Sequence, residues 1–396
     1  MTGRILPTSR RLLSFLSLAL AACADAPTVA VPPAPSTNAV KFWDASASLA
    51  WNRTARELIG ARSDAGNPTT QARLFTYLSI AQYNAVVAAE EARERGDHPS
   101  PAAAVAAASV AVLKSFLPAG THATLDARLQ AQLAAPGWPG ERHTDADAGL
   151  AVGQAVGAQV VAYAATDGAN GTPAPANPGG VGRWTGAGSF LGLYGARTLA
   201  LTSGDQFRPA PPPAYGSAQY AADLAEVKAL SIGITDAQRA TVTFWAPNNA
   251  TWMNALASDL IVSHHRTERE AARILTLANV AGFDVLNACF DAKFAYYYVR
   301  PSQADAGVKL ALPLPNHPSY PSGHSCITAA YATVLGDVFP DERARLDAMV
   351  DEAGMSRVYA GFHFRFDVDA GQVLGRRVAE WVLAHGVDRR APFALD

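Results

Sequence analysis

Apolar residues recur at helical spacing over most of the chain after residue 40, and the alternating pattern of β-strands is nearly absent. The clearest segment, residues 69–94, carries Leu74 and Leu78 on one face and follows the helix-start signal Asn67-Pro68. The pattern predicts further helices at residues 101–116, 122–134, 145–165, 217–230, 235–246, 250–264, 267–300, 323–338, 341–355 and 366–385. Short helices joined by turns favour an all-α fold built from helical bundles.

Composition divides this helical pattern into parts. We expect an N-terminal bundle at 41–166 and a C-terminal bundle at 217–396, with the similar segments 69–94 and 267–293 as their central helices. Between them, residues 167–216 are rich in glycine and proline and carry Trp184, Phe190, Tyr194 and Phe207. A connection this long is usually functional when aromatic residues hold it against the fold. The sequence therefore predicts a lid or wall over a pocket.

The N-terminus has the features of an export signal. Three arginines precede a short apolar run, and Leu20-Ala21-Ala22-Cys23 resembles a bacterial lipobox. Residues 1–22 are then a lipoprotein signal peptide, Cys23 is the lipidated residue, and 23–40 form a Pro/Ala-rich tether. Ala24 favours the outer membrane, facing the periplasm, and ordinary secretion is the alternative. No later segment is judged long and apolar enough to cross a bilayer.

Charge and cysteine content exclude some classes of protein. The chain has 32 basic and 34 acidic residues and lacks the basic stripe of a nucleic-acid-binding protein. Membrane contact is expected only through a lipid anchor at Cys23. The two remaining cysteines, Cys289 and Cys326, could form a disulfide in an oxidising compartment, although two buried free thiols are favoured. The oligomeric state is left open.

A candidate anion site lies at residues 316–325, where Asn-His-Pro-Ser-Tyr-Pro-Ser-Gly-His-Ser runs into an apolar helical pattern. The backbone amides near Ser322, Gly323 and His324 then lie at a helix N-terminus, which suits a tetrahedral oxyanion. Ser322 can cap the helix, and Gly323 lets the backbone approach a ligand closely. His324 can carry a proton near neutral pH.

Two cations precede this loop. Lys293 and Arg300 are seven positions apart, so they are predicted to project from one helix face, with Pro301 ending the helix. A solvated basic face is the simpler interpretation. The surrounding apolar and aromatic residues argue against it, because buried cations are costly unless an anion balances them.

A third segment contributes a histidine and a carboxylate. His363 and Asp367 are four apart, so on a helix the carboxylate can orient the imidazole and raise its nucleophilicity. Arg357 lies six positions before His363, which is not a shared helix face. We therefore expect the backbone to break near Gly361.

Taken in order, Lys-x6-Arg-Pro, Pro-Ser-Gly-His and Ser-Arg-x5-His-x3-Asp resemble the signature of the superfamily of type 2 phosphatidic acid phosphatases, bacterial non-specific acid phosphatases and vanadium haloperoxidases. The resemblance implies the helical fold of that superfamily and an enzyme. It implies that His363 is the nucleophile, Asp367 its orienting group and His324 the acid that protonates the leaving oxygen. It also implies that phosphate or vanadate is bound by Lys293, Arg300, Ser322, Gly323 and Arg357.

Phosphate and vanadate share a shape, so these residues alone do not distinguish the two reactions. His317 resembles the additional histidine that tunes halide use in algal bromoperoxidases. Phe290 stands where haloperoxidases usually have tryptophan or arginine, and the 356–370 region resembles the acid phosphatases. The sequence therefore favours an exported phosphatase without a cofactor, acting on a small-molecule phosphoester.

Two alternatives remain open. A vanadium haloperoxidase would use peroxide and halide, with His363 bonded to vanadate and His324 assisting peroxide binding. A non-catalytic oxyanion-binding lipoprotein would keep the site without chemistry, but the intact set of His324, His363 and Asp367 argues against it.

Overall fold

The computed structural model describes residues 47–60, 68–135, 141, 144–169, 173–186, 192–247, 250–387 and 391–395. The predicted signal peptide, the tether and Cys23 lie outside these residues. The described part of the chain is helical and forms only isolated β-bridges, which confirms the all-α prediction.

The helices follow in this order: α1 (Ala47–Gly60), α2 (Pro68–Glu94), α3 (Pro101–Phe116), η1 (Ala119–Thr121), α4 (His122–Leu133), α5 (Ala146–Ala165), α6 (Ala218–Ile232), α7 (Asp236–Trp245), α8 (Ala250–Ser263), α9 (Glu268–Tyr296), α10 (Pro301–Ala304), α11 (Gly323–Val338), η2 (Pro340–Glu342), α12 (Arg343–Tyr359) and α13 (Arg365–His385).

Local signals explain most of these bounds, but two predictions are wrong at their ends, and one of these is the helix predicted at 341–355, which continues to Tyr359. The Ser100 side chain caps α3 and Pro101 occupies its first turn, so the segment 101–116 is confirmed. The helix predicted at 267–300 instead ends at Tyr296. Tyr297 adopts a left-handed conformation at φ 45° and donates its N–H to the Lys293 carbonyl. Pro301 does not end α9 but begins α10.

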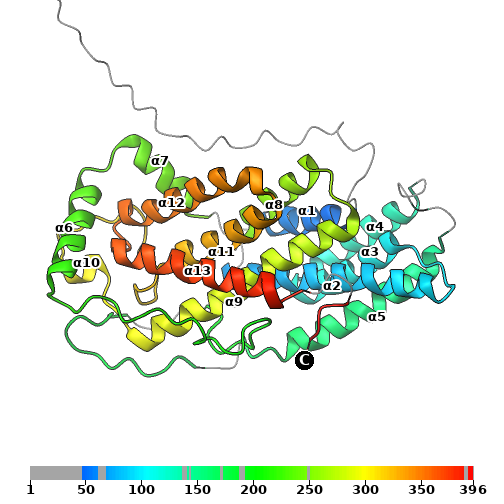
Figure 1. Ribbon diagram of the computed structural model, residues 1–396, viewed down its shortest axis with the longest axis horizontal. Coiled ribbons are helices and arrows are strands. Elements are labelled where there is room, and N and C mark those ends of the chain that lie inside the picture. Colours follow the sequence, from blue (N-terminus) through cyan, green and yellow to red (C-terminus); the bar gives the residue numbers. More distant parts are fainter. Residues whose placement is uncertain are drawn as a thin grey trace, which may run out of the picture. The chain divides into compact units, whose positions relative to one another are not determined.

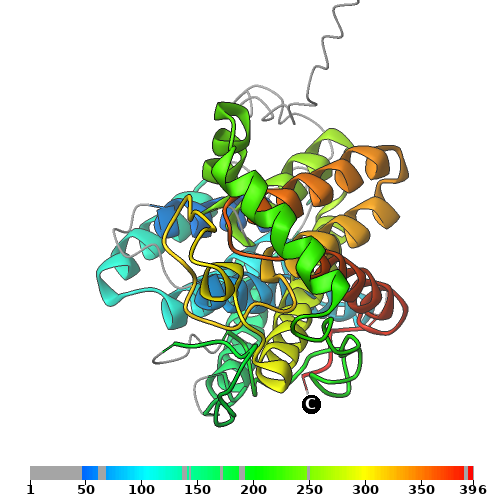
Figure 2. The ribbon, with the colours of Figure 1, turned by 90° about the vertical axis from the view of Figure 1, so that its left-hand side faces the viewer.

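The long helices α2 and α9 pack against each other at the centre of the bundle (Figure 1). Helices α3 and α5 cover α2, whereas α11 and α13 cover α9. One apolar core includes residues of both halves, such as Phe75 on α2 and Phe283 on α9. Figure 2 views the end of the bundle where green α6 and the yellow connection between α9 and α11 lie. The three predicted motifs meet at this end.

Helix α5 approaches α3 unusually closely. A Cβ atom added at Gly153 would lie 2.1 Å from the Ala104 carbonyl oxygen, and one at Gly149 would lie 2.4 Å from the Ser100 oxygen. Glycine at these positions removes the side chain that would hold the two backbones apart. The alanine-rich face of α3 therefore lies directly against the α5 backbone.

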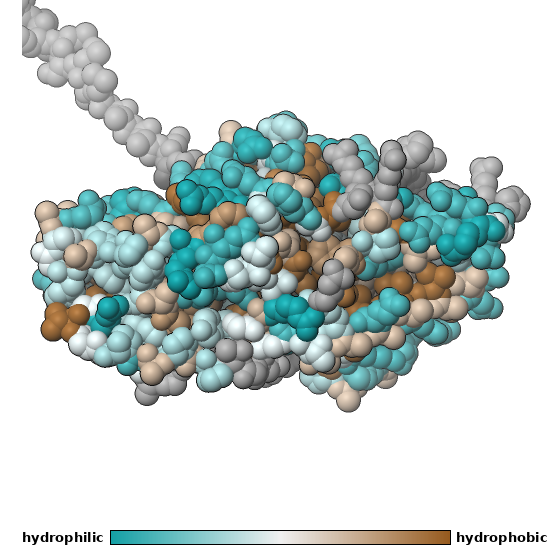
Figure 3. Space-filling view, turned by 60° about the horizontal axis from the view of Figure 1, so that its bottom comes forward, coloured by the Kyte–Doolittle hydropathy of each residue, from teal (hydrophilic) through white to brown (hydrophobic). Residues whose placement is uncertain are grey.

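Two helices correct the expectation that no later segment is apolar and long enough to span a bilayer. By length and composition, both α5 and α9 are long and apolar enough to cross a bilayer. The apolar window of α9 is 89% buried, as expected for a core helix, whereas that of α5 is 33% buried. Figure 3 brings the α5 side of the molecule forward and shows hydrophobic and hydrophilic residues intermixed there.

The described residues between α5 and α6 contain no helix, and tyrosine side chains hold part of this segment in place. The hydroxyl groups of Tyr296, Tyr298 and Tyr320 donate to backbone carbonyls of residues 209, 213 and 210, at 2.7, 2.6 and 2.7 Å. Tyr297 donates in the same way to the carbonyl of residue 175. Three of these tyrosines lie at the end of α9 and Tyr320 lies in the predicted anion loop, so the segment packs against the connection that carries the site.

A buried carboxylate holds another part of the same segment. Asp284 on α9 is fully buried and accepts the backbone N–H groups of Leu199, Ala200 and Leu201 at 2.8, 2.7 and 2.9 Å. Burial raises the pKa of Asp284 to about 6, and the three amides oppose that rise. The carboxylate is therefore the main polar link between α9 and residues 199–201.

Replacing Asp284 by Asn is expected to lower the free energy of unfolding by about 2–4 kcal/mol, because an amide NH2 group would face backbone donors. Urea denaturation followed by circular dichroism measures this loss. Asp291→Asn on the same helix is the matched control. Its partner Arg208 is more than a third exposed, so the control should lose less than about 1 kcal/mol. Equal losses in the two variants would contradict this role of Asp284.

Candidate active site

A cavity of about 440 Å³ lies where α9, α11 and the end of α12 meet. Its lining includes residues of the second and third predicted motifs, of the α9 face before Lys293, and of both halves of the chain. The lining residues are Pro68, Ala246, Leu286, Phe290, Pro315, Asn316, His317, Gly323, His324, Ile327, Arg357, Phe362 and His363. The other predicted anion ligands, Lys293, Arg300 and Ser322, are fully buried directly behind this surface.

The N-terminus of α11 forms one side of the site. Ser322 is its N-cap, and the Ser322 Oγ accepts the Ser325 N–H at 3.4 Å. A Cβ atom added at Gly323 would meet only Cys289 Sγ, at 4.0 Å, so packing does not require glycine there. Its absent side chain leaves the backbone amide open towards the cavity. Amides at a helix N-terminus favour an anion at this position.

Lys293 organises the anion loop from behind. Its ammonium group donates to the carbonyls of Pro318 and Ser319, both at 2.8 Å, and to that of Pro321. An ammonium group has three protons, so these carbonyls use all of its donors. Lys293 thus contributes its charge to the site while fixing the shape of the loop.

Arg300 reaches the site from an extended segment. Because α9 ends at Tyr296, the prediction that Lys293 and Arg300 share a helix face is wrong. The Arg300 Nη1 donates to the Phe362 carbonyl at 2.9 Å and lies 3.0 Å from His363 Nε2, while Nε donates to the His317 carbonyl at 3.0 Å. The guanidinium group therefore joins the anion loop to the histidine segment.

Arg357 lies in the last turn of α12, with its side chain 2% exposed. Its Nη2 donates to the Val242 carbonyl of α7 at 3.2 Å, and its Nε donates to Ser356 Oγ at 2.9 Å. The predicted backbone break is confirmed, since α12 ends at Tyr359 and Gly361 has a φ of 75°. This turn brings both Arg357 and His363 to the cavity.

The three cations are buried without matching carboxylates, and burial is the largest influence on each. It lowers the pKa of Lys293 to about 8 and those of Arg300 and Arg357 to about 10. Asp367 is the one carboxylate among the groups that raise these values for Lys293 and Arg300. The cluster therefore keeps an excess of positive charge that a bound dianion would balance.

His363 and Asp367 are in contact, although not as a pair along one helix. His363 precedes α13, and Asp367 lies in the first turn of that helix. The Asp367 Oδ2 lies 2.9 Å from His363 Nδ1, and it also accepts from Ser319 Oγ at 2.5 Å and from the Phe364 N–H at 3.2 Å. Since a carboxylate accepts, Nδ1 carries the hydrogen and Nε2 keeps its lone pair. That lone pair is on the atom next to Arg300.

Burial and the neighbouring cations set the protonation of this pair. They lower the pKa of His363 well below its ordinary value, with burial first and then Arg300 and Lys293. Burial raises the pKa of Asp367 to about 7, against the opposing effects of Ser319 and the cations. A neutral imidazole with its lone pair on Nε2, which here accepts a hydrogen bond from Arg300 Nη1, is the form that can act as a nucleophile.

His324 is held by a partner that the sequence did not indicate. Its Nε2–H donates to the Trp245 carbonyl at the end of α7, at 3.0 Å. Burial, followed by Arg357, lowers the pKa of His324 to about 3. The C-terminal carbonyls of α7 thus position both His324 and Arg357. Sequence analysis missed this role because any residue type can supply a backbone carbonyl.

His317 and Phe290 lie side by side on the cavity wall. Their ring centres are 5.2 Å apart in an edge-to-face arrangement, and the Arg300 Nη2 lies 3.0 Å from His317 Nδ1. Burial and then Lys293 lower the pKa of His317 well below its ordinary value. Cys289 and Cys326 are both buried free thiols in this structure.

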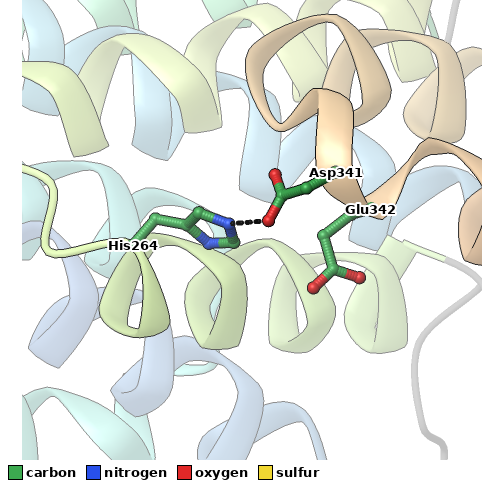
Figure 4. A group of neighbouring side chains, drawn as sticks. All are labelled: His264, Asp341 and Glu342. Carbon is green, nitrogen blue, oxygen red and sulfur yellow. Dashed lines mark hydrogen bonds and ion pairs between the residues drawn. The ribbon is translucent and has the colours of Figure 1, made fainter.

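A separate group of possible metal ligands lies outside this cavity and consists of His264, Asp341 and Glu342 (Figure 4). His264 Nε2 lies 3.1 Å from Asp341 Oδ2, and its Nδ1 lies 2.9 Å from the Leu260 carbonyl. Glu342 already accepts from Arg345 Nε at 2.6 Å. These contacts form an ion-pair network that joins the end of α8 to η2.

Sequence comparisons match parts of the chain to known proteins. A family model described as the VCPO second helical-bundle domain matches residues 342–390. The chain is 37% identical over 81 residues to a non-specific acid phosphatase of Providencia stuartii, which is 20% of this chain and 31% of that protein. It is 42% identical over 57 residues to one of Salmonella typhi, 14% of this chain and 23% of that protein. The matches thus span less than a third of these relatives.

Structural comparisons cover nearly the whole fold. The first bacterial vanadium-dependent iodoperoxidase superposes with a TM-score of 0.70 and 22% identity, over 85% of this chain and 94% of that one. A bacterial vanadium-dependent chloroperoxidase in its holo form superposes with a TM-score of 0.65 and 16% identity, over 85% of this chain and 96% of that one. These neighbours share the helical fold.

Replacing Arg357 by Gln is expected to weaken sulfate or phosphate binding by about 10- to 100-fold, since a charge-assisted hydrogen bond contributes about 1.5–3 kcal/mol. Isothermal titration calorimetry measures the affinity. Arg377→Gln removes an exposed arginine of α13 and serves as the control. Unchanged affinity in Arg357→Gln would exclude this residue from the anion site.

The affinity for sulfate should fall as the pH rises through about 8, by up to about tenfold per pH unit. Lys293 loses its proton near that pH rather than at its ordinary value of 10.5, and a bound anion favours the charged form. Sulfate keeps a constant charge over this range, so the slope reports the protein. Lys293→Met, checked for folding by circular dichroism, should bind more weakly and lose the slope. A slope that persists in this variant would assign the titration to another group.

Proposed function

We propose that this chain, a member of the superfamily that acid phosphatases and vanadium haloperoxidases share, hydrolyses phosphate monoesters through a phosphohistidine at His363. The observation that carries the proposal is the arrangement around this imidazole. Asp367 holds Nδ1–H, and Nε2 lies beside the Arg300 guanidinium in a cavity that also contains Arg357 and the α11 N-terminus. A nucleophile thus lies among groups that bind a tetrahedral dianion.

In the first step, the lone pair of His363 Nε2 attacks phosphorus and the bond from phosphorus to the ester oxygen breaks. His324 lines the same cavity and gives its Nε2 proton to the leaving oxygen, in place of its bond to the Trp245 carbonyl. Water then attacks the phosphohistidine, His324 takes up the water proton, and the bond from phosphorus to Nε2 breaks. Inorganic phosphate and the free imidazole result.

The cations stabilise the charge that develops on the phosphoryl oxygens. Arg300 and Arg357 donate from opposite segments, and Lys293 adds charge from behind the loop. A bound dianion would also offset the positive field that lowers the pKa of His324. Substrate binding therefore favours the protonated form that the leaving group requires.

The setting of the reaction is part of the proposal. The N-terminal sequence supports export, lipid attachment at Cys23 and a periplasmic position at the outer membrane, with secretion as the alternative. The substrate would then be a phosphoester available outside the cytoplasm, and no resident cofactor is needed.

A vanadium haloperoxidase is the second candidate, supported by the whole-length fold similarity and by His317 on the cavity wall. The buried cations and the unprotonated His363 Nε2 fit vanadate as well as phosphate. When bound, vanadate supplies a centre that activates peroxide towards halide. His363 Nε2 would hold it, the two arginines would balance its charge, and His324 would handle the peroxide proton.

Paired assays on the purified protein test the proposal: hydrolysis of phenyl phosphate, and bromination of a dye with vanadate, peroxide and bromide. We expect hydrolysis that vanadate inhibits and no bromination. His363→Ala should lower hydrolysis by at least about 10³-fold, because it removes the imidazole that forms the covalent intermediate. His317→Ala should retain most of the hydrolysis.

Bromination with little or no hydrolysis would reverse the order of the two candidates, particularly if His317→Ala changed the halide preference. Sulfate and phosphate binding without either activity would favour a non-catalytic oxyanion-binding protein. Full hydrolysis in His363→Ala would show that the nucleophile is assigned to the wrong residue.

A further inference from the structure

We infer that the alcohol portion of the substrate is small, uncharged and apolar, and that it binds in the cavity between α9 and α11. This inference rests on the proposed function and specifies the class of phosphomonoester. The reasoning depends on which residues extend from the anion site along these two helices.

On α9, the face that carries Lys293 continues with apolar residues. Phe290 and Leu286 lie three and seven positions before Lys293, which is about one and two helical turns, and both line the cavity. Phe290 is 3% exposed, and the 192 region of the Gly/Pro-rich segment packs directly behind its ring. The wall beyond the ammonium group is therefore apolar and firmly packed.

On α11, polar site residues also give way to apolar residues, but towards the C-terminus of the helix instead of the N-terminus. His324 lies at the start of the helix, and Ile327 follows about one turn later on the same cavity surface. Phe362, next to the nucleophilic histidine, adds a third buried apolar side chain to the lining. Both helices thus lead from the reacting groups to a hydrocarbon-lined space.

The described lining has few groups that could bind a polar alcohol. It contains no Asp, Glu, Lys, Ser or Thr, its charged residue is Arg357 at the anion site, and its other polar side chains are Asn316 and three histidines. Burial and the cations keep His317 neutral. The hydroxyl groups of a sugar or glycerol would lose water here without gaining equivalent hydrogen bonds, which is unfavourable. An aliphatic chain loses nothing on the same transfer.

The dimensions set an upper size. The cavity of about 440 Å³ must hold the phosphoryl group as well as the alcohol. The apolar wall of α9 extends from Leu286 to Phe290, which is about one helical turn, or roughly 6 Å. A chain of about six carbons matches that length, so hexyl phosphate represents the preferred class and glucose 6-phosphate the disfavoured one.

Alkylphosphonates test this inference without requiring turnover, because their carbon–phosphorus bond is not hydrolysed. Calorimetric titration of the full chain with methyl-, propyl- and hexylphosphonate should show affinity that rises with chain length, by about 100-fold from methyl to hexyl. A 2,3-dihydroxypropylphosphonate should bind no better than methylphosphonate. Equal affinities along the series, or tighter binding of the dihydroxy compound, would overturn the inference.

A variant of the wall locates the effect. Leu286 is half-buried and lies about two helical turns before Lys293, so Leu286→Gln should reduce the advantage of hexyl over methyl about tenfold and change methylphosphonate binding much less. Leu286→Met keeps the apolar surface and should keep the advantage. If both variants retain the advantage of hexyl over methyl, the alkyl chain binds elsewhere and the inference is wrong. The series on the unaltered protein decides the matter if Leu286→Gln does not fold.

Turnover of the matching phosphate esters separates this inference from the proposed function. Hexyl phosphate and glucose 6-phosphate are both esters of primary alcohols, so their chemical steps are similar. Hydrolysis of both at equal kcat/KM would overturn the inference and leave the phosphatase proposal standing. If phosphonate binding depended on the length of the alkyl chain but no ester was hydrolysed, the apolar binding site would stand and the phosphatase proposal would be overturned.

Discussion

The active-site end of the molecule depends on burying three cations whose hydrogen-bond partners are mainly backbone carbonyls. Lys293 is bonded to three carbonyls of the anion loop, Arg300 to two carbonyls of separate segments, and Arg357 to one from α7. Carbonyl dipoles satisfy the N–H donors but carry no net charge. The cluster can therefore be buried while keeping an excess of positive charge for a tetrahedral anion, which a set of carboxylates would have neutralised.

Much of this arrangement follows from the sequence. Side-chain signals such as Ser100 and Ser322 mark helix starts, and the convergence of three charged motifs on one pocket follows from the cost of burying cations separately. What could not be predicted depends on backbone groups. The left-handed turn at Tyr297 has no glycine to announce it, and the α7 carbonyls that hold His324 and Arg357 could belong to any residue type.

The sequence comparisons and the structural comparisons point to two different kinds of enzyme. Short stretches resemble acid phosphatases, whereas the whole helical architecture resembles vanadium haloperoxidases. Both activities need the same buried cations and the same oriented imidazole, so these features are not where the two reactions differ. The difference must lie in the groups that meet the leaving alcohol, the peroxide or the halide. In this chain the cavity surface beyond the anion site consists of the apolar walls of α9 and α11 together with His317.

The four tyrosines at and before the anion loop limit where the polypeptide can be cut without loss of structure. Four phenol hydroxyls secure the Gly/Pro-rich segment to the connection between α9 and α11, and α2 lies along α9 in a shared core. A fragment cut at residue 217 would leave these rings bare and strip the covering from its central helix. Residues 217–396 are thus not expected to fold as an independent unit. A chimaeric protein that contains residues 217–396 would also need the preceding 170 or so residues.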